Sequence, residues 1–277
     1  MEQYKERYME LREGNLKLIT PDEQWEANIR SKSLRYYKPS SYEGFYATIG
    51  ETYLEIENDA LTAKQYFNKA AMSCHLSYQL ASQEIPNTIP FIPKPGIWGS
   101  HNGYKYFILA DNFKMLPVLA QTILDYKGEQ CEPRLSHNLA DACRNFWAGR
   151  LEKALPIVHK CYASSIKKSN VCYGGLASLL LGIIEKRPEL IEQAMIMEEK
   201  AHIRESRAWP SIFSDIGLGM VFIAKLARHY GFDPDVSSKY IHKGLLEYNA
   251  NIIYEEASEL KYAMEMVLRN GGNGVKK

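Results

Sequence analysis

Apolar residues along this chain recur every three or four positions, the spacing of one face of an α-helix. One series runs Ala63, Tyr66, Phe67, Ala70, Cys74, Tyr78 and Ala81. Two more keep this spacing: Phe213, Ile216, Gly217, Met220, Ile223, Ala224 and Ala227, then Ile253, Ala257, Leu260, Met264 and Val267. The alternation of apolar and polar residues that marks a half-buried strand is hard to find. The pattern therefore predicts an all-α protein.

Prolines divide this helical pattern. Three stand where new helices are expected to begin: Pro21, Pro188 and Pro210. The first turn of a helix tolerates the missing N–H of proline. Four more prolines crowd the segment EIPNTIPFIPKPGIWGSHNG, where each removes a backbone donor and restricts the preceding residue. We expect an N-terminal helical region at 1–84, a packed Pro-rich loop at 85–101 and a larger C-terminal helical region at 102–277, together forming one compact unit.

Several predicted helix pairs resemble one another. In YATIGETYLEIENDALTAKQYFNKA, Gly50 precedes a polar turn, and Ala63 and Phe67 follow it. This pair is similar to a tetratricopeptide repeat, in which small residues let antiparallel helices approach, although its turn is one residue longer. NFWAGRLEKAL and LLLGIIEKRPELIEQAM each predict a helix, a short turn and a second helix. The sequence therefore predicts stacked antiparallel α-hairpins in a solenoid-like, tetratricopeptide-like bundle.

Charge and composition exclude several function classes. The chain has 34 Lys and Arg against 33 Asp and Glu, without the basic excess of nucleic-acid-binding proteins. The charged start MEQYKERYMELREGN contains no apolar signal segment. The most apolar run, YGGLASLLLGII, is about half the ~20 residues that a membrane-spanning helix needs. We therefore expect neither nucleic acid nor membrane as a partner.

Cysteine usage indicates a reducing compartment. The five cysteines have no C-x-x-C spacing, which favours neither a disulfide framework nor a zinc site. Three of them fall on apolar helix faces, where we expect small buried side chains: Cys74, Cys143 and Cys161. The sequence thus predicts a cytoplasmic protein.

No motif of catalysis or metal binding stands out. The patterns H-E-x-x-H, G-x-S-x-G and G-K-[ST] are absent. His159 and Cys161 are two residues apart, which places them on different faces of a helix, so we expect an exposed histidine and a buried cysteine. His137 and Asp141 have i,i+4 spacing and could orient an imidazole, although a surface pair explains them more simply. We therefore assign no catalytic, cofactor-binding or metal-binding residue and predict that the protein is not an enzyme.

The segment AKLARHYGFDPDVSSKYIHKGLL, at 224–246, predicts the end of a buried helix and the start of another. Basic residues gather in the last turns of the first helix: Lys225, Arg228 and His229. Positive charge there complements the carbonyl end of the helix dipole. We expect Gly231 to adopt the left-handed conformation that ends the helix, and Ser237 or Ser238 to cap the next one.

This arrangement resembles a known family. Leu-Ala-x-x-x-Gly, a short linker with Val236, Ser-x-Tyr-Ile and then Leu-Leu are similar to the C-terminal signature of the immunity protein 49 family, and the resemblance covers roughly 135–248. His242 stands where the family pattern has proline. Members of that family are all-α cytoplasmic proteins that neutralise a cognate toxin by binding it. The resemblance therefore implies an immunity protein whose partner is a cognate toxin protein.

Candidate partner-binding residues come from the aromatic content. The chain contains 19 tyrosines, and exposed tyrosines are favoured interface anchors, although helix packing accounts for many of them. We select Tyr36 and Tyr37 in LRYYKPSSYEG, and Trp98 and His101 in the Pro-rich loop. Two alternatives stay open: a tetratricopeptide-like scaffold or regulator that binds peptide segments, and an enzyme with a deep polar pocket near His101 or His137.

Overall fold

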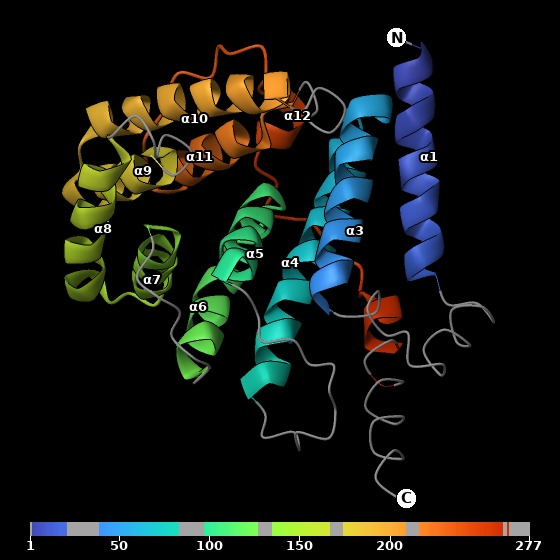
Figure 1. The fold of residues 1–277 in the computed structure, drawn as a ribbon, viewed down its shortest axis with the longest axis horizontal. Helices are drawn as coiled ribbons and strands as arrows, with labels where there is room; N and C mark the ends of the chain where they lie inside the picture. Colours follow the sequence, from blue (N-terminus) through green and yellow to red (C-terminus); the bar gives the residue numbers. More distant parts are fainter. Residues whose placement is uncertain are drawn as a thin grey trace, which may run out of the picture. The chain divides into compact units, whose positions relative to one another are not determined.

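The computed structural model describes residues 2–20, 39–82, 97–126, 135–166, 174–208, 216–262 and 265. Throughout these ranges the regular secondary structure is helical and no strand occurs (Figure 1). Successive helices pack against one another. The prediction of an all-α protein is therefore confirmed, whereas the stacking of hairpins into a solenoid stays a prediction.

Two compact units make up the chain. Unit 1 combines Met1–Ala110, Thr122–Gly128 and Asn251–Lys277, and unit 2 combines Asp111–Gln121 and Glu129–Ala250. The C-terminal residues thus belong to the same unit as the N-terminal ones.

This division differs from the predicted regions 1–84, 85–101 and 102–277. Helix α5 (Ile97–Leu109) begins inside the predicted Pro-rich loop, so residues 97–101 are helical. The prolines of that loop lie outside the described residues.

Unit 1 is built from packed helices that follow one another in sequence. They are α1 (Glu2–Ile19), α3 (Pro39–Thr52), α4 (Ala60–Ser82) and α5. Figure 1 shows α3, α4 and α5 side by side, and α1 packs along α3. Aromatic rings fill the core between them, since Tyr42, Tyr46 and Phe67 are fully buried.

A π-helical turn accounts for the long connection between α3 and α4. The π-helix η2 (Tyr53–Glu57) follows α3 directly, and Asn58 then takes a left-handed φ of 54°. The wider turn accommodates an additional residue while the two helices stay in contact. A Cβ added at Gly50 would lie 3.1 Å from Phe67 Cε1 and 3.2 Å from the Ala63 carbonyl oxygen. The close approach predicted for this pair is therefore present.

The C-terminal segment of unit 1 runs beside α4. Gln65 Nε2 donates to the Ile253 carbonyl at 2.8 Å, and the Glu255 N–H donates to Gln65 Oε1 at 3.0 Å. Because one amide side chain takes both backbone groups, this stretch is held out of a helix. The predicted helix face starting at Ile253 is therefore wrong at its start: Ile253 is 89% exposed, and the helical turn covers 258–262. Met264 and Val267 lie outside the described residues.

Unit 2 contains the predicted helix pairs. Its helices are α7 (Leu135–Trp147), α8 (Leu151–Ser165), α9 (Gly174–Glu185), α10 (Pro188–Ala208), α11 (Leu218–His229) and α12 (Lys243–Leu246), and α6 (Met115–Asp125) begins in it. The first pair turns at Gly149, with a φ of 72°. The second turns at Lys186, with a φ of 57°, two residues before Pro188 begins α10. Both predicted turns are confirmed, while Pro21 and Pro210 lie outside the described residues.

The connection after α11 is confirmed in one part and wrong in another. Gly231 has the predicted left-handed φ of 85°. The next helix, α12, is capped by His242, whose Nδ1 accepts the Leu245 N–H at 3.1 Å. Ser237 and Ser238 are therefore not the cap. Instead, Ser238 Oγ donates to Glu199 Oε1 on α10 at 2.6 Å.

Two Gly→Ala substitutions in helices should have opposite effects on stability, because one glycine is tightly packed and the other is not. At Gly182 a Cβ would lie 2.8 Å from Ile191 Cδ1 and 3.0 Å from the Arg187 carbonyl oxygen. We expect Gly182→Ala to lower the free energy of unfolding by about 1–2 kcal/mol, because overpacking outweighs the gain in helix propensity. Gly44, on α3, has no atom within 4 Å of such a Cβ, so Gly44→Ala raises stability by up to about 1 kcal/mol. Urea unfolding measures both, and equal gains would contradict this packing.

Candidate functional site

The structure places only part of the predicted partner-binding set. Tyr36 and Tyr37 lie outside the described residues. Trp98 lies in α5, and its side chain is outside the described part. His101, one turn further along α5, is half-buried.

His101 adjoins a buried polar cluster between α3, α4 and α5. Asn102 Nδ2 donates to Glu43 Oε1 at 2.6 Å, and the Cys74 thiol interacts with the same carboxyl. Burial raises the pKa of Glu43 and lowers the pKa of His101 to about 4, with the Lys105 charge adding to the latter. The imidazole is therefore neutral at pH 7. Its contact with a partner stays a prediction, now for a neutral and half-buried ring.

The structure describes part of the other two pairs that the sequence singled out, His159 with Cys161 and His137 with Asp141. His159 is exposed and Cys161 is buried, as predicted. Burial also raises the pKa of Cys161 to about 11, which makes it a poor nucleophile. Asp141 pairs with Arg144 at 2.9 Å, while the side chain of His137 lies outside the described part.

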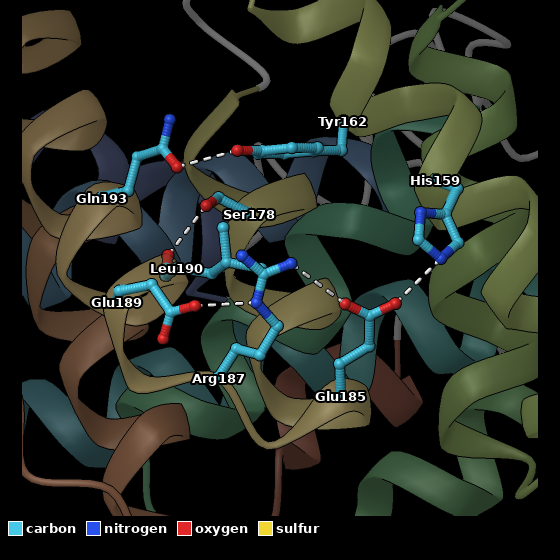
Figure 2. Close-up of polar contacts among 8 residues, drawn as sticks. All are labelled: His159, Tyr162, Ser178, Glu185, Arg187, Glu189, Leu190 and Gln193. Atoms are coloured by element: carbon cyan, nitrogen blue, oxygen red, sulfur yellow. Dashed lines mark hydrogen bonds and ion pairs between the residues drawn. The ribbon is translucent and has the colours of Figure 1, made fainter.

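Figure 2 shows a line of polar contacts across α8, α9 and α10. His159 Nε2 lies 2.9 Å from Glu185 Oε1, and Arg187 Nη1 lies 3.4 Å from Glu185 Oε2. Arg187 Nε then donates to Glu189 Oε1 at 2.7 Å. Solvent screens these pairs, because their side chains are 26–62% exposed. The line therefore adds little to stability.

Two less exposed contacts in the same view tie the three helices together. Tyr162 OH donates to Gln193 Oε1 at 2.9 Å, which joins α8 to α10. Ser178 Oγ donates to the Leu190 carbonyl at 2.7 Å, which joins α9 to α10.

Across the part of the chain that the structure describes, no three His, Cys, Asp or Glu side chains are grouped to hold a metal ion. The described helices also include none long and apolar enough to cross a membrane.

The strongest candidate site is a cluster of aromatic rings in unit 2, at the end of α11. Its members, which we call the aromatic surface, are Phe113, Phe146, Trp147, His229, Tyr230 and Tyr248. The His229 and Phe113 rings stack with centroids 4.1 Å apart, and Tyr248 meets Phe113 edge-on at 5.9 Å. Tyr230 continues the cluster, 5.2 Å from His229 and 5.5 Å from Phe146. The rings thus form one connected series.

Exposure varies along the aromatic surface. Phe146 and Trp147 are 6% and 7% exposed, whereas Tyr230 is 42% and Tyr248 63% exposed. The stack on Phe113 partly buries His229, and this burial lowers its pKa, which favours the neutral imidazole. Two exposed tyrosines packed on buried and half-buried rings are the composition expected of a protein-binding hot spot.

A buried charge pair holds the backbone beneath these rings. Lys225 on α11 and Asp111 form an ion pair, and both side chains are at most 2% exposed. Lys225 Nζ also donates to the Leu245 carbonyl at 2.8 Å, and Asp111 Oδ2 accepts the Asn249 N–H at 3.2 Å. The pair therefore joins three stretches of chain that each carry an exposed or half-buried ring.

This site was not predicted from the sequence, for a specific reason. Lys225 was expected to complement the helix dipole, but it is buried and paired with a residue far earlier in the chain. One signal was available: Lys225 lies between Ala224 and Leu226 in a helix that is apolar on more than one face. A charge there requires a buried partner.

Comparisons with known proteins add nothing to this assignment, since no family model, curated protein or solved structure matches the chain. The site therefore rests on the residues and contacts given above.

Removing the cation of the buried pair should be strongly destabilising. We expect Lys225→Met to lower the free energy of unfolding by about 3–5 kcal/mol, because the Asp111 carboxylate stays buried without its partner. Lys153→Met, at an exposed position of α8, changes stability by less than about 0.5 kcal/mol. Urea unfolding of both variants and of Asp111→Asn/Lys225→Met measures this. The double variant should regain much of the loss, and additive losses would contradict a direct pairing.

His101 should make stability depend on pH. Its pKa of about 4 in the folded protein lies below the ordinary 6.5. As the pH falls from 6.5 to 4, the unfolded chain takes up a proton that the folded imidazole does not, so stability falls. We expect this contribution, at most about 1.4 kcal/mol per pH unit, to vanish in His101→Asn.

The measurement is urea unfolding of both proteins at pH 7, 6 and 5. The raised pKa of Glu43 acts in the opposite direction, so the difference between variant and wild type is the readout. Identical pH profiles would show that His101 titrates normally.

Proposed function

We propose that the protein works by binding another folded protein through the aromatic surface, as an immunity protein that neutralises a cognate toxin in the cytoplasm. The observation that carries the binding role is a pair of exposed tyrosines in one ring cluster. Tyr230 packs on the buried ring of Phe146, and Tyr248 packs on the half-buried ring of Phe113. Tyrosine offers a large contact area and loses little conformational entropy on binding. The toxin as partner follows from the resemblance at 135–248, which includes Tyr230 and Tyr248.

Anchored backbone favours tight binding to one partner. Tyr248 lies between Leu245 and Asn249, whose backbone groups contact Lys225 and Asp111. A surface that is already ordered loses little freedom on association. Arg228, two residues before Tyr230, is paired with Asp233 at 3.2 Å. Contact area rather than long-range charge attraction would therefore supply most of the affinity.

Substitution of the exposed tyrosines should weaken partner binding without unfolding the protein. The partner to test is the product of the adjacent open reading frame, co-expressed with this protein. We expect wild type to rescue growth and co-purify, and Tyr230→Ala/Tyr248→Ala to weaken binding at least about 30-fold, corresponding to about 2 kcal/mol. Ile196→Ala, at a position of α10 that is 52% exposed, is the matched control.

The outcomes separate the two parts of this proposal. Full rescue and unchanged affinity in the double tyrosine variant would place the interface elsewhere. A harmless neighbour with no folded protein bound would contradict the immunity role.

A further inference from the structure

Unit 1 contains a cleft between α1, α4 and the helical turn at 258–262. Its volume is about 410 Å³, within the range of small-ligand sites. Leu16 and Ile19 supply apolar walls from α1, and Tyr66 supplies a phenol from α4. Ser258 and Glu259 line it from the C-terminal side. An apolar wall with a few converging polar groups is the composition of a binding site.

The charges around this cleft are unequal. Lys69 Nζ lies 3.3 Å from Glu259 Oε1 and 3.4 Å from Glu255 Oε2, so one cation faces two carboxylates. Arg12 pairs one-to-one with Glu57. Among the described residues of this cluster, one negative charge is therefore in excess. Glu259 is the carboxylate nearest the cleft, and its side chain is 16% exposed.

Aromatic rings extend the negative character. The Tyr66 ring stacks on Tyr53 with centroids 5.6 Å apart, and Lys69 Nζ lies 5.4 Å from the centroid of Tyr66. Arg12 lies 4.9 Å from the Tyr53 centroid. Two protein cations thus already bind to the faces of these rings, the interaction that an ammonium group makes with tyrosine. Burial raises the pKa of Tyr66 to about 12, so its hydroxyl stays available as a donor or acceptor.

We propose that this cleft binds an alkylammonium group, with the ammonium at Glu259 and Tyr66 and the apolar chain along Leu16 and Ile19. An excess carboxylate rejects anions, while the apolar wall favours a chain of several carbons over a bare metal ion. Such a group occurs in free diamines and in lysine side chains of peptides. This site lies in unit 1 and is independent of the aromatic surface.

Titration calorimetry on the full chain tests the proposal with defined probes. The probes are 1,5-diaminopentane and a capped Gly-Lys-Gly peptide, each compared with a neutral isostere, 1-pentanol or capped Gly-norleucine-Gly. We expect at least one cation to bind saturably and its isostere not to bind. Saturation by the diamine alone assigns a free amine, and saturation by the peptide alone assigns a lysine side chain. Absence of saturation by either cation, or equal binding of the isostere, overturns the proposal.

Two variants locate the binding and one controls for charge. Glu259→Gln should weaken binding at least tenfold, and Leu16→Trp should block it by filling the cleft. Glu256→Gln removes the same charge three residues earlier, at an exposed position paired with Lys261, and should leave affinity within twofold. Circular dichroism confirms that each variant is folded. Unchanged affinity in both cleft variants overturns the assignment, as does an equal loss in Glu256→Gln.

Discussion

The buried pair of Asp111 and Lys225 fixes the architecture of unit 2 around its candidate site. Removing two ions from water costs several kcal/mol for each, so such a pair persists only where further hydrogen bonds complete its coordination. Here these are the Leu245 carbonyl and the Asn249 N–H. Asp111 itself has a φ of 68°, a left-handed conformation that aspartate tolerates better than most residues. Backbone strain and desolvation therefore cost free energy at this one point. The same contacts hold three distant stretches of the chain at fixed positions relative to one another.

The positions of the rings in the aromatic surface depend on these anchored stretches. Phe113 comes two residues after Asp111, His229 comes one turn after Lys225, and Tyr248 precedes Asn249. The pair and its hydrogen bonds hold these backbones, and the Phe113–His229 stack at 4.1 Å is a consequence of that anchoring.

The linker after α11 is held by similar contacts to one face of α10. Glu192 accepts the Asp235 N–H at 3.2 Å, Glu199 accepts from Ser238, and the His202 ring meets Tyr240 at 4.8 Å. These three α10 residues recur at seven- and three-residue spacing, which places them on one side of the helix.

The sequence predicted the features that depend on short-range interactions and did not predict those that depend on long-range ones. The helix pairs, the stops at Gly149 and Gly231 and the buried cysteines depend on neighbours within a few positions, and periodicity reports those. The Lys225 pairing joins residues more than a hundred positions apart, and no local pattern encodes it. The cap of α12 lies between these cases. Ser237 and Ser238 have the right chemistry for a cap, but their hydroxyls bond to Asp235 and Glu199, and the imidazole of His242 is nearer to the first turn. Composition could suggest the candidates, and only the backbone path could choose among them.

Tyrosine residues also show that residue type alone does not predict a functional role. Tyr42 and Tyr46 are fully buried in unit 1, while Tyr230 and Tyr248 are largely exposed in unit 2, and nothing in the residue type separates the two roles. Backbone anchoring does. An exposed ring on a free loop would lose backbone and side-chain freedom on binding, whereas Tyr248 lies between Leu245 and Asn249, which Lys225 and Asp111 already hold, and loses mainly its own rotamer freedom. The free-energy cost of desolvating Asp111 and Lys225 has already been offset when the protein folds, before a partner binds. The conformational entropy lost on binding is therefore smallest where the aromatic surface is most exposed.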